Sequence, residues 1–269
     1  MSERIARPAR GSMRSPLVSA PIRSGILLLA LLGGETIPMA AQSPDRAAIE
    51  RAREAMVTVL ARRGVRDSAT LRALRTVPRH EFVELADPLQ AYADRPHAIG
   101  HGATISQPFV VGRMTELLHP RPGLRVLEVG TGSGYQAAVL AEIGCEVFTI
   151  ELVEPLATLA RSRLDRLGYA AVRSRQGDGY LGWPEAAPFD AIVVTAAAPE
   201  VPPALVAQLR PGGRMVIPTG PTDGVQHLLA ITKDARGRVR TRRLEPVRFV
   251  PLIPADTGAT GRQSMPNRR

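Results

Sequence analysis

The sequence predicts an open α/β fold with a mostly parallel sheet and helices on both of its faces. In the stretch from Arg125 to Gly134, RVLEVGTGSG, a short apolar run is followed at once by closely spaced glycines, and helix-like apolar spacing begins at Tyr135. This order of strand, tight turn and helix is typical of the ligand-binding corner of an α/β sheet. The nearly all-apolar run FDAIVVTAAA, residues 189–198, adds a strand that is buried on both faces, as parallel sheets require.

The spacing of the glycines separates two classes of nucleotide site. A dinucleotide fingerprint, G-x-G-x-x-G/A, needs a small third residue, and the bulky Tyr135 stands at that place. Glu128, Gly130, Gly132 and Gly134 instead form the pattern E-x-G-x-G-x-G, which resembles the first motif of S-adenosylmethionine (AdoMet) methyltransferases. The resemblance implies a Rossmann-like AdoMet-dependent methyltransferase fold.

Glu151 ends the next apolar run, EVFTIE, which we expect to be the second strand. An acidic residue at the end of the second strand of such a sheet is placed to accept hydrogen bonds from ribose hydroxyls. The alternative is a solvated charge at the start of the following helix. Beside the glycine turn we favour the ribose interpretation.

The charge distribution argues against a nucleic-acid partner. The formal charge is +10, but residues 42–232 hold 20 arginines and 20 acidic residues. The excess lies in residues 1–41 and 233–269, so a basic groove built from the body is not supported. Cys145 is the one cysteine, which excludes an intramolecular disulfide, and the five histidines lack metal-site spacing, so we predict no metal.

Four segments follow from composition. Residues 1–41 form a leader in which arginines precede GILLLALLGG; if residues 13–41 act as a signal peptide, the protein is periplasmic or secreted. The apolar stretch is too short for a stable membrane anchor. Residues 42–117 form a helical preface, and residues 118–253 an AdoMet-binding core that ends in partly antiparallel strands. Residues 254–269 lack apolar side chains to bury and should be disordered.

The preface contains one clear helix pattern and one predicted loop. The helix is expected over residues 47–60, with an apolar face made of Ile49, Ala52, Met56, Val59 and Leu60. Residues 97–108 are predicted to be a loop, because Gly100, Gly102 and Pro108 interrupt regular structure. This polar loop can fold over the cofactor pocket. From the residue type alone, Ser106 could equally cap the helix that follows.

Six stretches together resemble protein-L-isoaspartate O-methyltransferases. They are VPRHEFV, IGHGATISQP, VLEVGTGSGYQAAVLA, GDGYLGW, APFDAIVVTAAAPEVPPALVAQLRPGGRMVIP and VRFVPL, in the order and spacing of that family from about Ala47 to Ile253. The resemblance implies methyl transfer from AdoMet to the free α-carboxylate of L-isoaspartyl and D-aspartyl residues in age-damaged proteins and peptides. It also implies a cytoplasmic location, and we expect a monomer.

The resemblance also implies roles for individual residues. Ser106 matches the serine that the family places at its active site. Asp178 matches the acid that faces the adenine amino group, with an Asp-Gly turn as the alternative. We expect the cofactor to be bound by Thr104, Ile105, Glu128, Gly130, Gly132, Gly134, Glu151, Asp178 and Gly179. We expect the substrate backbone to be bound by Ala196, Ala197 and Val250.

The expected chemistry needs no strong general base. A carboxylate is ionised at neutral pH and is itself the nucleophile, so the enzyme has only to align it and exclude water. The Ser106 hydroxyl would donate a hydrogen bond to one carboxylate oxygen. Two other hypotheses stay open at this point: an AdoMet methyltransferase that acts on RNA or on a small molecule, and a non-catalytic AdoMet-binding protein.

Overall fold

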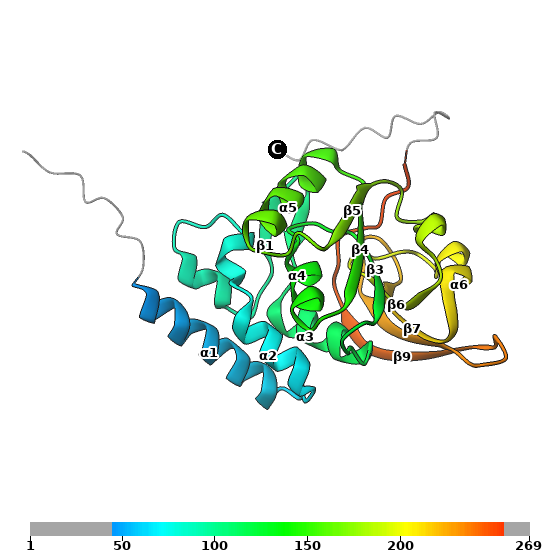
Figure 1. The fold of residues 1–269 in the computed structure, drawn as a ribbon, viewed down its shortest axis with the longest axis horizontal. Coiled ribbons are helices and arrows are strands. Elements are labelled where there is room, and N and C mark those ends of the chain that lie inside the picture. Colours follow the sequence, from blue (N-terminus) through cyan, green and yellow to red (C-terminus); the bar gives the residue numbers. More distant parts are fainter. Residues whose placement is uncertain (1–44, 256–269) are drawn as a thin grey trace, which may run out of the picture. The chain divides into compact units, whose positions relative to one another are not determined.

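The computed structural model describes residues 45–255, so the predicted leader and nearly all of the predicted tail lie outside the described residues. Its main element is a seven-stranded sheet (Figure 1). The strands are β3 (Arg125–Val129), β4 (Glu146–Glu151), β5 (Arg173–Gln176), β6 (Phe189–Val194), β7 (Leu209–Thr219), β8 (Gln226–Lys233) and β9 (Val239–Val247). They lie in the order β5-β4-β3-β6-β7-β8-β9.

The order in which the chain adds strands reverses at β3, and this reversal locates the functional end of the molecule. Strands β5, β4, β3, β6 and β7 are parallel, whereas β8 and β9 pair antiparallel. From β3 the chain runs to β4 and β5 on one side and then returns to β6 and β7 on the other. Ligands bind at such a switch point, outside the carboxyl ends of the strands.

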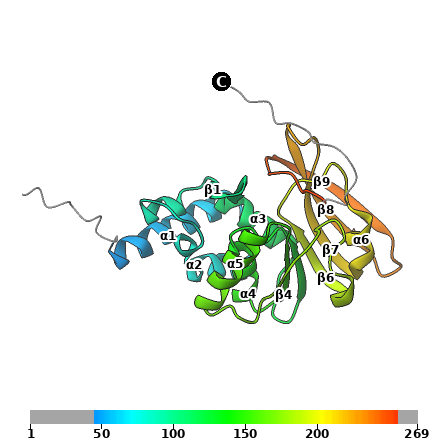
Figure 2. The same cartoon turned by 90° about the horizontal axis from the view of Figure 1, so that it is seen from above.

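Helices cover both faces of the sheet (Figure 2). One face carries α1 (Arg46–Arg62), α2 (Ser68–Thr76), α3 (Pro108–Leu117), α4 (Tyr135–Glu142) and α5 (Glu154–Arg166). The other carries the short α6 (Pro203–Gln208). Ala186 of the 3-10 turn η3 (Pro184–Ala186) packs in the same hydrophobic cluster as Leu205 of α6. Side chains alternate across β3 accordingly: Val126 packs with the first group, and Leu127 and Val129 with the second.

Residues 45–117 are helical over most of their length. After α1 and α2 come two 3-10 turns, η1 (Arg79–Phe82) and η2 (Pro88–Tyr92). The predicted buried face of α1 is wrong at one position, because Val59 is 42% exposed and Val57 is buried in its place.

The predicted loop over residues 97–108 is largely a hairpin, which corrects the sequence-based expectation. Strands β1 (His97–Gly100) and β2 (Ala103–Ile105) pair antiparallel. His101 and Gly102 connect them with φ values of +51° and +72°. Two consecutive residues with positive φ are the signature of a tight two-residue hairpin turn. Gly102 therefore belongs to the turn, and Gly100 ends β1 at a shift in the strand register.

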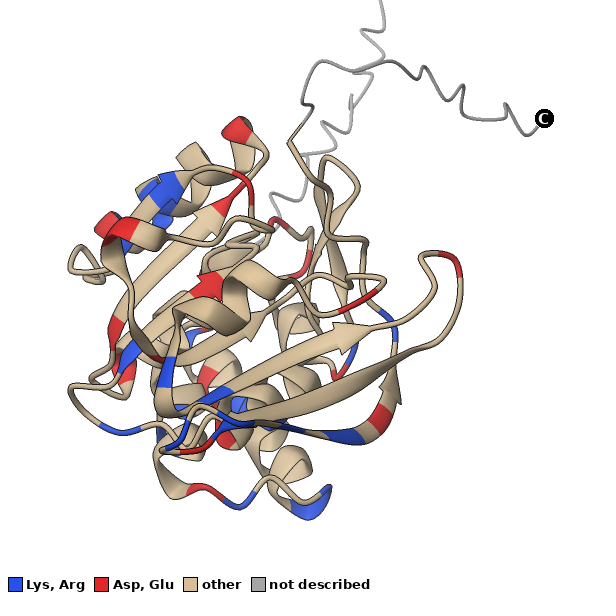
Figure 3. Ribbon diagram, turned by 90° about the vertical axis from the view of Figure 1, so that its right-hand side faces the viewer, with Lys and Arg blue, Asp and Glu red and all other residues tan. Residues whose placement is uncertain are grey.

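Two surface properties bear on possible partners. No helix within residues 45–255 is long and apolar enough to cross a membrane. Basic and acidic residues are interspersed over the ribbon rather than separated into one positive and one negative face (Figure 3).

Candidate active site

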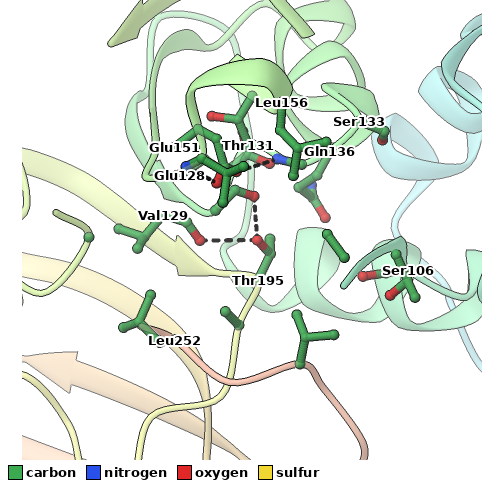
Figure 4. A pocket seen from close by; sticks show the side chains of 18 of the residues that line it. Ser106, Glu128, Val129, Thr131, Ser133, Gln136, Glu151, Leu156, Thr195 and Leu252 are labelled. Atoms are coloured by element: carbon green, nitrogen blue, oxygen red, sulfur yellow. Dashed lines mark hydrogen bonds between the residues drawn. The ribbon is translucent and has the colours of Figure 1, made fainter. Parts of the chain in front are cut away.

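A cavity of about 360 Å³ lies at the carboxyl ends of β3 and β4 (Figure 4). Its walls come from the glycine turn after β3, the end of β4, strand β2 and the segment that follows β9. Of the predicted site residues, ten line it: Thr104, Ile105, Ser106, Glu128, Gly130, Gly132, Glu151, Gly179, Ala196 and Val250. The size is that of a small-molecule or cofactor site.

The glycine turn depends on the absence of side chains. Gly130 has a φ of +94°, and a Cβ there would lie 2.5 Å from Thr195 Oγ1. The Thr195 hydroxyl lies 2.5 Å from the carbonyl oxygen of Gly130 and 3.0 Å from that of Val129, and a bond to either ties the end of β3 to the end of β6. Gly134 does not line the cavity. It is the N-cap of α4, with a φ of +90°, and packs against Ala160 of α5.

Glu151 lies at the end of β4 and is 8% exposed. One of its carboxylate oxygens, Oε2, accepts from the backbone N–H of Gly132 at 2.8 Å, and the other, Oε1, accepts from that of Val153 at 3.0 Å. The carboxylate therefore holds the glycine turn against β4. Each oxygen keeps a lone pair for a further donor in the cavity.

Glu128 is a fully buried carboxyl group in the cavity wall. Its Oε2 accepts from the Thr149 hydroxyl at 2.6 Å, and Thr149 is in turn hydrogen-bonded to the Thr131 hydroxyl at 2.6 Å. Its Oε1 has no hydrogen-bond partner among the described residues. Burial raises the pKa of Glu128 to about 8, and the nearby charge of Glu151 adds to the rise. The carboxyl is therefore poised to respond to a bound donor or cation.

Ser106 does not cap the helix that follows it. The N-cap of α3 is Gln107, whose side chain makes no capping bond. The backbone N–H of Phe109 instead donates to the Asp94 carboxylate at 2.9 Å. Within residues 45–255 no hydrogen bond involves the Ser106 hydroxyl, although the backbone carbonyl of Ser106 accepts one from Arg79. The hydroxyl is therefore available to a ligand.

A second cavity of about 640 Å³ also has Ser106 in its wall. Thr104 and Ser106 line both cavities. The second cavity is otherwise lined by the start of α3, the segment before β8 and the end of β9, with Phe109 and Phe249 among its walls. The two spaces therefore meet at the Ser106 segment.

The structure does not bring Asp178 into the cavity wall. Its carboxylate accepts from the backbone N–H of Tyr180 at 2.8 Å and from that of Ala255 at 3.0 Å. The bond from Tyr180 is typical of a local Asp-Gly turn, which was the alternative interpretation of Asp178. Each oxygen keeps a lone pair for a further donor, so a contact with adenine would require only that the Asp178 carboxylate reach the cavity, whose wall it does not form. Neighbouring Gly179 does line the cavity, and a Cβ there would lie 2.5 Å from Val129 Cγ1.

Of the three predicted substrate-binding residues, only two lie in the wall of the first cavity. Ala196 and Val250 line the first cavity, whereas Ala197 does not. The backbone N–H of Ala197 donates to the carbonyl oxygen of Val250 at 2.8 Å, and the N–H of Leu252 donates back to Ala197 at 2.7 Å. These bonds hold the segment after β9 over the cavity.

Several polar residues of the cavity were not predicted, namely His101, Thr131, Ser133, Gln136 and Thr195. Thr195 directly follows the apolar run of β6, and its position at the carboxyl end of a buried strand could have identified it. Gln136, on the first turn of α4, donates to the Thr115 hydroxyl at 2.8 Å and gave no sequence signal. Among residues 45–255 no group of three or more His, Cys, Asp or Glu side chains could hold a metal ion.

Comparison with known proteins assigns this arrangement to a family. The family described as protein-L-isoaspartate(D-aspartate) O-methyltransferase matches residues 51–257. A protein-L-isoaspartate O-methyltransferase 1 from Cupriavidus necator is 49% identical over 253 residues, which cover 90% of this chain and 98% of the relative. A protein-L-isoaspartate O-methyltransferase from Opitutus terrae is 56% identical over 211 residues, 77% of this chain and 90% of the relative.

Solved structures agree with the sequence relatives. A Plasmodium falciparum structure assigned to the protein-L-isoaspartate O-methyltransferases, in complex with S-adenosyl-L-homocysteine, is 29% identical. It superposes with a TM-score of 0.64 over 75% of this chain and 98% of that one. The predicted Rossmann-like methyltransferase fold is confirmed, and the chain belongs to the protein-L-isoaspartate(D-aspartate) O-methyltransferase family.

Proposed function

We propose that the chain transfers a methyl group from AdoMet to the free α-carboxylate of L-isoaspartyl residues, and of D-aspartyl residues, in age-damaged proteins and peptides. The observation that carries the proposal is the meeting of two cavities at Ser106 and Thr104. A cofactor in the first cavity and a peptide in the second would face each other across this segment. Family membership supports the same assignment.

The first cavity fits AdoMet in charge and in shape. AdoMet supplies a methyl group that its positively charged sulfonium has already activated toward a nucleophile. The wall holds two carboxyl groups, Glu128 and Glu151, and Glu128 Oε1 lacks a partner within the described residues. Free lone pairs on Glu151 can accept from ribose hydroxyls. The open turn at Gly130 and Gly132 lets the backbone approach the ligand.

The remaining predicted contacts surround these two carboxyl groups. Thr104 and Ile105 would cover the cofactor from β2, and Gly179 would give it room beside β3. Gly134 acts through the fold, because it lets α4 start directly behind the turn. Asp178 is proposed to bind the adenine amino group through a lone pair that its bonds to Tyr180 and Ala255 leave free.

The second cavity suits a peptide that carries one carboxylate. Its aromatic and aliphatic walls can cover a peptide chain, and its arginines offer attraction to anions, partly balanced by Glu245. Arg113, for example, donates to Glu245 at 2.9 Å and to Glu116 at 3.0 Å. Ala196 and Val250, in the wall of the first cavity, and Ala197, which is bonded to Val250, would contact the kinked main chain of the substrate.

The chain's residues need to position the reactants rather than to move a proton. The substrate carboxylate is ionised at neutral pH and attacks as it is. The Ser106 hydroxyl would donate to one of its oxygens and leave the other directed toward the methyl group. Alignment of two bound reactants can lower a barrier by about 7–11 kcal/mol in the best cases, which explains why no Ser–His or His–Asp pair is needed.

The test is methyl transfer from radiolabelled AdoMet to two peptides of identical sequence, one with an isoaspartyl and one with an ordinary aspartyl linkage. Transfer RNA serves as a third acceptor. We expect label only in the isoaspartyl peptide, as a base-labile methyl ester. Equal labelling of the two peptides, or labelling of RNA alone, would show that the substrate assignment is wrong.

A further inference from the structure

Arg79 is a buried arginine beside the candidate active site that the chemistry described above does not use. It begins η1, and its side chain is 0% exposed. Its Nε donates to the carbonyl oxygen of Ala91 at 2.7 Å, and its Nη2 donates to that of Ser106 at 2.7 Å. The guanidinium carbon lies 4.8 Å from the centre of the Tyr135 ring, which lines the cofactor cavity. One side chain thus joins η1, η2, the Ser106 segment and the start of α4.

This burial is costly, so packing alone does not account for an arginine. Within residues 45–255 no acidic side chain forms a salt bridge with Arg79, and its Nη1 has no hydrogen-bond partner there. Burial lowers the pKa of Arg79 to about 10, which still leaves the group charged at neutral pH. A charge buried in this way is commonly less stabilising than an apolar residue of the same size. What the arginine provides instead is its two bonds to backbone carbonyls.

The bond from Arg79 to the Ser106 carbonyl fixes the backbone that sets the position of the Ser106 hydroxyl. A hydrogen bond to the Ser106 carbonyl sets the plane of the peptide between Ser106 and Gln107. The hydroxyl itself has no hydrogen bond within the described residues, so its position follows from the backbone. A second anchor acts one residue later, where Gln107 Nε2 donates to the carbonyl oxygen of Asp94 at 2.9 Å.

On the basis of the proposed function, we propose that Arg79 is a positioning residue for methyl transfer: its guanidinium holds the Ser106 carbonyl so that the hydroxyl stays where the two cavities meet. Arginine suits this task because Nε and Nη2 lie on one edge of a rigid plane and reach both carbonyls together. Lysine keeps the charge but has a single flexible ammonium group, so it cannot reproduce the paired contact.

The experiment compares the wild type with Arg79→Lys, under conditions where both are folded by circular dichroism. We expect a ten- to hundredfold fall in the single-turnover rate with an isoaspartyl peptide, in line with the effect of misplacing a reacting group. The Kd for AdoMet and the KM for the peptide should stay within about threefold. Backbone amides of residues 103–107 should exchange faster with deuterium, whereas those of β3 and β4 should not.

Two further variants separate positioning from general stability. Arg163→Lys alters another buried arginine, 7% exposed on α5, and should leave rate and exchange unchanged. In a Ser106→Ala background, Arg79→Lys should lower the single-turnover rate less than threefold, because the hydroxyl that Arg79 positions is already absent. Additive losses, or a wild-type rate in Arg79→Lys, would overturn the proposal.

The same experiments distinguish a variant that fails to fold from a failure of the proposed function itself. If neither Arg79→Lys nor Arg79→Gln retains AdoMet binding and a native melt, Arg79 serves the core and the proposal is wrong. If the wild type does not methylate the isoaspartyl peptide, the proposed function fails. The deuterium exchange of residues 103–107 still decides whether Arg79 holds the Ser106 segment, and unchanged exchange would refute it.

Discussion

At the scale of single residues, Glu151 combines a structural and a binding role. Its two oxygens already hold the backbone of Gly132 and Val153, and they can accept ribose hydroxyls as well. We expect Glu151→Ala to weaken AdoMet binding by about 1.5–3 kcal/mol, the range for hydrogen bonds to a charged group. Isothermal titration calorimetry measures the AdoMet affinity of both proteins. Glu154→Ala, which removes an exposed acid of α5, is the control. An affinity within twofold of the wild type would remove Glu151 from the binding site.

We expect Glu128 to make the stability of the ligand-free protein depend on pH. Its pKa is raised from 4.5 to about 8 in the folded state. Between about pH 5 and pH 8 the folded chain therefore holds a proton that the unfolded chain has lost, and the free energy of unfolding falls as the pH rises. The contribution of this one group is at most about 1.4 kcal/mol per pH unit.

The variant Glu128→Gln cannot titrate, so its unfolding free energy should fall less steeply over the same pH range. Urea denaturation of both proteins at several pH values between 5 and 8, without AdoMet, gives the two slopes. Parallel curves would mean that Glu128 is ionised throughout and that its burial does not control its protonation.

At the scale of elements, α3 is capped by a residue that lies far from it in sequence. Asp94 accepts from the backbone N–H of Phe109 and also pairs with Arg63. We expect Asp94→Ala to lower the free energy of unfolding by about 0.5–2 kcal/mol, the usual cost of losing an N-cap. Asp94→Asn, which keeps an acceptor oxygen, should cost less. Asp67→Ala, which removes the cap of α2, gives a reference value. Wild-type stability of Asp94→Ala would contradict this account of the helix start.

Most elements could be predicted because their signals are local. The strands around the glycine turn and the run FDAIVV are short apolar segments, and β3, β4 and β6 coincide with them. The hairpin of β1 and β2 is not predictable from Gly100 and Gly102 alone, because glycine is typical both of loops and of tight hairpin turns; here positive φ at residues 101 and 102 builds the turn. The helix that contains Val59 was predicted, but its buried side depends on what packs against it, which periodicity does not give.

At the scale of the whole molecule, the first cavity could be predicted and the second could not. The first follows from a rule about the carboxyl ends of parallel strands, so the glycine turn and Glu151 were sufficient to locate it. The second is assembled from Arg63, Thr104, Val225 and Glu245, which are distant in sequence and share no motif. The contact of Asp178 with Ala255 is of the same kind, because it depends on the path of the chain after β9.

The placement of Ser106 at the junction of the two cavities is tested most directly by single-turnover methylation of an isoaspartyl peptide by Ser106→Ala at saturating AdoMet. Because Asp94, not Ser106, binds the start of α3, the variant should melt close to the wild type. We expect its rate to fall between ten- and a thousandfold with little change in AdoMet affinity, and Ser106→Thr, which keeps a hydroxyl, to retain more activity. A wild-type single-turnover rate in Ser106→Ala would contradict the account, because methyl transfer would then not depend on the hydroxyl at that junction.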